Sequence, residues 1–592
     1  MNCLFIVVDS FSYSLVQRSK LDLTPNLNKR AEKGIKCEAV YSQAPYTEAA
    51  AMALYCGQNT LSHHGYIERY NQAKTTLTEA FQHAGYEVFF NSLQPQCFPS
   101  SLRRGIDVVR YNRGYDADAL WHYRFLHYAD KAKSTGLISV DYFQLFRIME
   151  DNFADWIIFL EDILNDSPSV SMIQQHNLDF CADSVLQEVR EQQAKYQKDK
   201  KAYIDDILQK QLQHPIFQIP FFQQKDYNIS EKTEMLYQGE CRKLCNKVRL
   251  YNFIGNALSN FGVYTGIIKA FTTYQKNHDR KQLSQSLFNI KNTLVLCNHR
   301  KKYGKQCHAF KGQPSFHSHI LSFLDWIDSR KSPKPFFACL HVDDIHHSEM
   351  FYTYDTDDCG IIRSELELAE NYLKNRNIFT PGTVSSALSL LYVDAKCEYL
   401  IRQLEERGLD KDTMIFVTSD HGFSFSGYPI RNKLVNSFYL ENFHIPFYVF
   451  GPKLHSRKIT RLHSSVDIPP TICEIMGIET PESFEGQSVL KQHSSNTILI
   501  EYCGGGCPDI DNRELMIAAF DQSYFVAALV KLYDVFTADH ISEVYNLKKD
   551  PLQKHNIAKT VNKKLLNQYI EAIDFRLQQI RATNDHWKET PN

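Results

Sequence analysis

A short apolar run that stops abruptly at an acidic residue opens the chain. Leu4–Val8 is such a run, and Asp9 follows it directly. Two later runs, Phe336–Leu340 and Met414–Thr418, have the same length, are similarly apolar and also meet polar residues at their C-terminal ends. Continuous apolar runs of this size are typical of strands buried on both faces of a sheet. Because helical patterns such as Ser385–Arg407 lie between them, the sequence predicts an α/β fold with a mostly parallel central sheet flanked by helices.

The composition and spacing of the 592-residue chain change near residue 108 and again near residue 333, which gives three regions, and we expect the last of them to contain two parts. We expect the α/β domain to begin at residues 1–107 and to continue at 333–495, with a C-terminal subdomain and a terminal helix at 496–592. Between them, residues 108–332 are poor in glycine and rich in helical spacing, so we expect a large, mainly helical insertion. One apolar face in this insertion comprises Leu145, Ile148, Met149, Phe153, Trp156, Ile157, Leu160 and Leu164.

Charge and cysteine usage exclude several classes of protein. Lys plus Arg number 66 against 68 for Asp plus Glu, so no overall basic field favours nucleic acid as a partner. No window reaches the roughly 18 apolar residues that a membrane span needs. The apolar run near Met1 is too short for a signal peptide and reads as a strand. Fifteen cysteines at irregular spacing fit reduced thiols, and we therefore expect a cytoplasmic protein.

Polar side chains follow several of the predicted strands. Asp9 ends the first, His341 and Asp343 end the run at Phe336, and Asp420 with His421 follow the run at Met414. Sites in open parallel sheets lie beyond the carboxyl ends of the strands, and Asp with His is a typical ligand set for a divalent cation. Each residue alone has a simpler explanation, such as a helix cap for Asp9. Their coincidence favours a metal site.

Motifs along the chain resemble those of sulfatases, in the same order. Thr24–Gly34 is similar to the segment TPNLD-x-LA-x-x-G, and Ser42–Pro45 is similar to the lead-in to the sulfatase nucleophile. The other matches are Ser419–Gly422, Lys433, Ile445–Pro446, Val466–Thr471 and Glu543–Pro551. The resemblance covers about 1–107 and 335–560 and implies an enzyme of the sulfatase branch of the alkaline phosphatase superfamily, with that fold.

The motif of the nucleophile departs from the sulfatase pattern. Sulfatases carry Cys-x-Pro-Ser-Arg, and here Thr47 stands at the cysteine and Ala51 at the arginine. Formylglycine cannot form from threonine. The Gly-Lys-Trp-His motif falls on Ser92–Pro95, so its lysine and histidine are missing too. Threonine at this position resembles the phosphoryl-transfer branches of the superfamily, in which a metal lowers the pKa of the hydroxyl nucleophile.

The resemblance implies the roles of the site residues. Thr47 is the expected nucleophile, and Asp9, Asp420 and His421 together with Thr47 are the expected ligands of a divalent cation. Because His421 offers nitrogen, we expect Mn²⁺ or Zn²⁺ rather than Ca²⁺ or Mg²⁺.

Further polar residues extend the expected site. His346 aligns with the sulfatase histidine that contacts the leaving-group oxygen. Lys433 aligns with the lysine that holds a substrate oxyanion, but a lysine exposed to solvent with no role in the site explains it equally well. Asn91 either hydrogen bonds a phosphoryl oxygen or caps a turn. Asp343 and His347 resemble a motif for a second metal, with His463 as a third ligand, so one or two ions are expected.

Two functions remain open from the sequence. The first is a metal-dependent hydrolase or transferase that acts on a phosphate or sulfate ester through a covalent Thr47 intermediate. Its substrate would be a small-molecule or glycan-linked anionic ester, and a phosphoryl-linked group would pass to water or to a glycan. The second is a non-catalytic sulfatase-like scaffold whose insertion binds a partner. The sequence does not define the oligomeric state.

Overall fold

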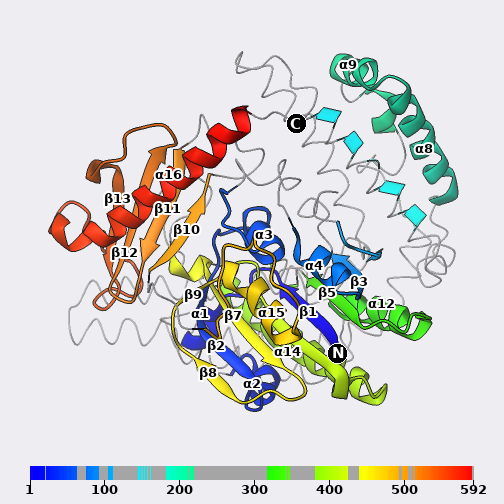
Figure 1. Cartoon of the computed structure of the whole chain (residues 1–592), viewed down its shortest axis with the longest axis horizontal. Helices are drawn as coiled ribbons and strands as arrows, with labels where there is room; N and C mark the ends of the chain where they lie inside the picture. Colours follow the sequence, from blue (N-terminus) through cyan, green and yellow to red (C-terminus); the bar gives the residue numbers. More distant parts are fainter. Residues whose placement is uncertain are drawn as a thin grey trace, which may run out of the picture.

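The computed structural model describes residues 1–19, 22–62, 75–92, 104–110, parts of 145–161, 182–210, 213–218, 316–342, 344–346, 381–423, 439–491, 497–503, 510 and 514–589. Figure 1 shows a large sheet wrapped by helices, a smaller sheet beside it that carries the C-terminal helix, and the helices α8 (Ala182–Lys198) and α9 (Lys200–Lys210).

The large sheet has nine strands, in the order β4-β3-β5-β1-β6-β7-β2-β8, and β9 pairs with β2. Its strands are β1 (Asn2–Val8), β2 (Ile35–Tyr41), β3 (Glu87–Ser92), β4 (Val108–Arg110), β5 (Phe336–Val342), β6 (Thr413–Thr418), β7 (His444–Phe450), β8 (Arg457–Ile459) and β9 (His463–Ser464). β1 lies at the centre and pairs in parallel with β5 on one side and with β6 on the other. The predicted mostly parallel α/β sheet is therefore confirmed.

Helices cover both faces of the large sheet, which is why its central strands β1, β5 and β6 are buried at every position and mostly apolar. Cys3, Phe5 and Val7 of β1 belong to one buried cluster, and Leu4 and Ile6 belong to another. The first face packs against α3 (Thr47–Cys56), α4 (Leu77–His83) and α15 (Ile468–Met476), and the second against α1 (Tyr13–Arg18), α2 (Pro25–Ala31), α12 (Phe316–Ser329) and α14 (Pro381–Glu406). A strand enclosed in this way has no solvent-facing side to carry polar residues.

Two further apolar runs, Ile445–Phe450 and Ile498–Glu501, resemble the buried parallel strands in sequence but do not pair in parallel. β7 contains the run Ile445–Phe450 but is antiparallel to both of its neighbours, β6 and β2. The end of β7 at Phe450 therefore lies at the opposite edge from the ends of β1 and β6. The run Ile498–Glu501 lies in β10 (Ile498–Tyr502), which belongs to the smaller antiparallel sheet.

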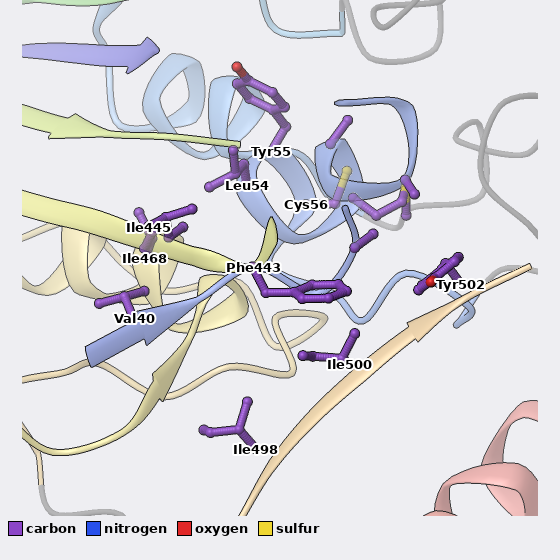
Figure 2. Close-up of a cluster of buried hydrophobic side chains, with 14 of the residues drawn as sticks. Val40, Leu54, Tyr55, Cys56, Phe443, Ile445, Ile468, Ile498, Ile500 and Tyr502 are labelled. Carbon is purple, nitrogen blue, oxygen red and sulfur yellow. The ribbon is translucent and has the colours of Figure 1, made fainter. Parts of the chain in front are cut away.

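The smaller sheet has the order β10-β11-β12-β13, with β11 (Glu514–Phe520), β12 (Tyr524–Lys531) and β13 (Ile541–Asn546). α16 (Asn567–Glu589) packs on it. Both sheets share one apolar cluster. Figure 2 shows Ile498, Ile500 and Tyr502 of β10 facing Phe443 and the residues of α3. Burial of this cluster fixes the smaller sheet against the helix that begins at Thr47.

The segment that resembles TPNLD has a structural role. Asp394 of α14 accepts hydrogen bonds from the backbone N–H groups of Asn26 (3.0 Å) and Leu27 (2.8 Å), at the start of α2. These N–H groups have no partner within their own helix, so the Asp394 carboxylate caps α2 from outside. This contact holds α2 against α14 on the second face of the sheet.

The domain boundaries remain a prediction, although two elements bear on them. β4 begins at Val108 and pairs with β3, so the large sheet extends to Arg110. Within the insertion, the apolar face at Leu145, Met149, Phe153, Trp156 and Leu160 is helical and fully buried where the structure describes it. Residues 219–315 lie outside the described part of the chain. No helix among the described residues is long and apolar enough to cross a membrane.

Candidate functional site

The site lies where three parallel strands end side by side. β5, β1 and β6 are neighbours in the sheet, and the backbone N–H of Asp9 donates to Val342 O at 2.7 Å, just beyond β1 and β5. The Ser419 hydroxyl ties β6 to β1, since its oxygen lies 2.6 Å from Val8 O and accepts from the Phe11 N–H at 2.9 Å. Parallel pairing therefore brings together side chains separated by more than 300 positions in the sequence.

Helix α3 supplies the hydroxyl. Its first residue is Thr47, and its sequence is rich in alanine, so that the helix fits closely between the sheets. The turn before α3 is anchored by Ser42, whose hydroxyl donates to Asp420 O at 2.6 Å. Thr47 is 6% exposed, and its Oγ1 donates to Asp9 Oδ2 at 3.1 Å. The start of a helix also favours a bound anion through its free N–H groups and its dipole.

His421 presents one defined ring nitrogen to the site. Its Nδ1 lies 2.7 Å from Gly422 O, and a carbonyl only accepts, so Nδ1 carries the proton. Nε2 therefore faces the site, 3.4 Å from Thr47 Oγ1 and 3.4 Å from Asp9 Oδ1. Gly422 is required here, because a Cβ at this position would lie 2.2 Å from Glu441 O.

Asp420 has one oxygen occupied and one without a hydrogen bond. Its Oδ1 accepts from the backbone N–H of His421 (2.7 Å) and of Ser10 (3.2 Å). Ser10 has a positive φ of 65°, which few side chains adopt. Asp420 Oδ2 is buried and has no hydrogen-bond partner, which is costly for a carboxylate. It lies 3.6 Å from His421 Nε2 and 3.8 Å from His341 Nε2.

The electrostatics of the cluster are balanced between carboxylates and imidazoles. Burial would raise the pKa of Asp9, but His346, His421 and His341 hold it well below its ordinary value. Burial would lower the pKa of His421, and the Asp420 and Asp9 carboxylates raise it instead. Burial dominates at His341 and lowers its pKa. Asp9 is thus an anion, which suits a metal ligand better than a base.

The donor set fits a divalent cation. The ligand atoms of Asp9, His341 and Asp420 lie within 4.8 Å of one another, and all three side chains are buried. Carboxylate oxygen and imidazole nitrogen are the donors that Zn²⁺ and Mn²⁺ accept. The unsatisfied Asp420 Oδ2 is the atom that a cation would neutralise. The convergence of Asp9, Thr47, Asp420 and His421 that the sequence implies is therefore present, and His341 is an addition to it.

Of the other expected site residues, His346 lies beside the cluster and the side chain of Asn91 points away from it. His346 is exposed, in the turn after β5, close enough for its charge to lower the pKa of Asp9. Asn91 is fully buried near the end of β3, and neither atom of its amide has a hydrogen-bond partner. By alternation with Phe90, its side chain points to the face of α12 and α14, away from α3. Its role remains a prediction.

The proposed second metal set cannot be assembled from the described residues. Asp343 and His347 lie outside them, as does Lys433. His463 is described. It lies on β9, fully buried, with Nδ1 3.4 Å from Asp467 Oδ2, and it does not belong to the group formed by Asp9, His341 and Asp420.

Sequence reasoning counted His341 among the polar residues at the strand ends but did not include it in the expected ligand set, and it did not consider Tyr55. His341 ends an apolar strand, and alternation with Cys339 places it on the α3 face; this signal was present in the sequence. Tyr55 lies later on the same helix as Thr47, in a run of buried residues, and nothing in its local pattern separates it from the core.

The protein thus belongs to the α/β class and has a candidate metal centre. Two carboxylates, the imidazoles and the hydroxyl of a residue that begins a helix meet where neighbouring parallel strands end. A model of the family described as Sulfatase matches residues 1–213 and 221–478. The chain belongs to the sulfatase family. The match also runs through most of the region 108–332, which the sequence motifs left uncovered.

Two N-acetylglucosamine-6-sulfatases share less than a third of their aligned residues with this chain. The chain is 29% identical to human N-acetylglucosamine-6-sulfatase over 234 residues, which is 34% of this chain and 41% of the relative. It is 28% identical to the enzyme of the same name from Bos taurus over 326 residues, 45% of this chain and 55% of the relative. The chain thus spans only about half the length of these curated relatives.

A solved structure has the same fold. It comes from work on glycosaminoglycan metabolism by Bacteroides thetaiotaomicron, with a TM-score of 0.50 and 14% sequence identity, and the likeness covers 98% of this chain and 96% of that one.

Proposed function

We propose that the protein is a metal-dependent hydrolase or transferase of phosphate esters, or of sulfate esters, that uses Thr47 as its covalent nucleophile. The observation that carries this proposal is the position of Thr47 Oγ1, 3.1 Å from Asp9 Oδ2 and 3.4 Å from His421 Nε2 at the start of a helix. Family membership supports ester chemistry, and threonine in place of the cysteine favours phosphate, because formylglycine is not available to this chain.

Each residue of the site has a separate role in the proposed transfer of the phosphoryl group. Thr47 Oγ forms a bond to phosphorus, the bond from phosphorus to the leaving oxygen breaks, and the Thr47 proton passes to water, because Asp9 and His421 beside the hydroxyl are the expected ligands of the cation. His346, exposed beside the site, would protonate the leaving oxygen. A bound divalent cation would lower the pKa of the hydroxyl and offset negative charge on the transferred group. Water or an acceptor hydroxyl then releases the group from Thr47.

The acceptor and the location of the protein also belong to the proposal. The relatives from human and Bos taurus are N-acetylglucosamine-6-sulfatases, which supports a glycan-linked ester as the substrate. Transfer to a glycan hydroxyl differs from hydrolysis only in which hydroxyl reaches the Thr47 ester. A cytoplasmic location is consistent with the buried free thiols of Cys3, Cys37, Cys56, Cys339, Cys397 and Cys473.

A substrate screen tests the proposed chemistry. Nitrophenyl phosphate monoester, phosphate diester and sulfate ester are each incubated with the protein and Mn²⁺, Zn²⁺ or Ca²⁺. We expect the highest kcat/KM on a phosphate ester with Mn²⁺ or Zn²⁺. Faster turnover of the sulfate ester would contradict the choice of phosphate, and turnover that is best with Ca²⁺ would contradict the role of nitrogen ligands.

Replacing Asp420 tests the metal site. In Asp420→Asn the remaining oxygen still accepts from Ser10 and His421, but the charge at Oδ2 is lost. We expect a folded protein whose Zn²⁺ or Mn²⁺ binding, measured by calorimetry, is abolished. Asp344→Asn is the matched control, since Asp344 is also buried, with Oδ1 bonded to the Phe316 N–H and Oδ2 without a partner. Equal loss of binding in both variants would mean that the site is misassigned.

A further inference from the structure

A tyrosine and a histidine meet behind the metal-capable cluster. Tyr55 Oη lies 3.3 Å from His341 Nδ1, and the two rings are 6.3 Å apart at 38°. Tyr55 is held edge-on by Phe5 and Phe90, and its hydroxyl points away from the labelled apolar residues in Figure 2. Its ring is thus fixed by packing, so its hydroxyl has a defined position beside His341.

The other nitrogen of His341 faces the carboxylate that needs a partner. Nε2 lies 3.8 Å from Asp420 Oδ2, too far for a hydrogen bond. That oxygen is buried and unpartnered, while Asp420 Oδ1 is already occupied by two backbone N–H groups. His341 Nε2 and Asp420 Oδ2 therefore face each other at a distance that is too long for a hydrogen bond between them. A cation placed between the two atoms could bind both.

The hydroxyl of Tyr55 can hold His341 in the tautomer that a ligand needs. A hydroxyl oxygen accepts as well as donates, so Tyr55 Oη, 3.3 Å from Nδ1, can accept from Nδ1–H. The Nε2 lone pair then points to Asp420. Metal-ligating histidines almost always donate their second N–H to a fixed acceptor in this way, and His421 does the same with Gly422 O.

We propose that His341 is a ligand of the divalent cation through Nε2, with Tyr55 as the residue that positions it. The inference rests on the proposed metal site and extends its ligands to two carboxylates, two imidazoles and the Thr47 hydroxyl. Two nitrogen donors favour Zn²⁺ or Mn²⁺ over Ca²⁺ more strongly than one does. Tyr55 lies on the same helix as Thr47, so α3 would set both the nucleophile and one ligand.

Zinc affinity and the visible spectrum of the Co²⁺-loaded protein test this ligand directly, without reference to turnover. In His341→Asn the amide keeps a polar atom near Tyr55 but has nothing at Nε2. We expect its Zn²⁺ affinity to fall by more than about 100-fold and its Co²⁺ bands to change, since loss of an outer partner alone costs about 10–100-fold. Tyr55→Phe keeps the packing with Phe5 and Phe90 and should lose about 10-fold.

His319→Asn is the matched control. His319 is a fully buried histidine of α12 whose ring nitrogens have no hydrogen-bond partner, and it does not belong to the ligand group. Its replacement should leave the affinity and the Co²⁺ spectrum unchanged. A loss equal to that of His341→Asn would overturn the inference, because removal of any buried imidazole would then suffice.

The outcomes separate this inference from the proposed function. If Asp420→Asn loses zinc while His341→Asn keeps wild-type affinity and an unaltered Co²⁺ spectrum, His341 is not a ligand and the proposed function stands. If His341→Asn loses zinc while the wild-type protein turns over no ester, the ligand stands and the proposed function falls. Should His341→Asn fail to fold, Tyr55→Phe decides, and an unchanged affinity and Co²⁺ spectrum in that variant would overturn the proposal.

Discussion

Thr47→Ala is expected to reduce kcat by several orders of magnitude while Zn²⁺ binding persists. Covalent catalysis loses its attacking oxygen, whereas Asp9, Asp420 and the two imidazoles still hold the cation. Thr47 Oγ1 donates to Asp9 Oδ2 and also approaches His421 Nε2, whereas the Ser10 hydroxyl donates to the other oxygen of that carboxylate, Oδ1, at 2.8 Å. Single-turnover kinetics on the best nitrophenyl ester, with metal content measured on the same sample, checks both halves of the expectation.

Two variants make that result specific. Thr47→Ser keeps a hydroxyl and should retain part of the activity. Thr60→Ala removes another buried hydroxyl, one that donates to Ala49 O of the same helix at 2.9 Å, and should leave kcat close to wild type. Retention of full activity in Thr47→Ala would show that the group is transferred without a covalent Thr47 intermediate.

The strand ends that form the site were predictable from the sequence because two features of the sequence identify each of them. An apolar run marks a strand buried on both faces, and the polar residue after it marks where the strand emerges. Asp9 and Asp420 have both marks, so their meeting follows once β1 and β6 are placed in parallel. Thr47 has neither mark, and only its spacing from motifs that resemble those of sulfatases indicated its place.

Strand direction and sheet membership were not predictable in the same way. β7 is as apolar as β1 and is fully buried along its length, yet it runs antiparallel, because direction depends on the path of the connecting chain rather than on side-chain pattern. β10 joins a second sheet for the same reason. The contact between Tyr55 and His341 spans 286 positions. His341 is recognisable in the sequence as a polar residue at the end of an apolar strand, whereas Tyr55 lies in a run of buried residues with nothing local to distinguish it, so the pairing could not be predicted.

A buried ion pair behind α3 was also absent from the sequence reasoning. Arg576 of α16 contacts the Glu501 carboxylate of β10 with two nitrogens, at 2.6 Å and 2.9 Å, and donates to the Ser62 hydroxyl at 2.9 Å. Glu501 also accepts from the Leu61 N–H at 2.7 Å. Arg576 and Glu501 are 4% and 0% exposed. This network joins the C-terminal helix α16, the smaller sheet and the segment that follows α3.

Arg576→Met is therefore expected to lower the free energy of unfolding by about 3–5 kcal/mol, because it leaves the Glu501 charge buried and unpaired. Arg407→Met is the matched control: Arg407 also contacts a carboxylate with two nitrogens, but Asp328 is 55% exposed, and such a pair contributes about 1 kcal/mol or less. Urea unfolding of the metal-free protein measures both. The double variant Arg576→Met with Glu501→Gln should recover much of the loss, since a neutral amide removes the stranded charge. Equal effects at Arg576 and Arg407, or no recovery in the double variant, would show that the unpaired charge is not the cause.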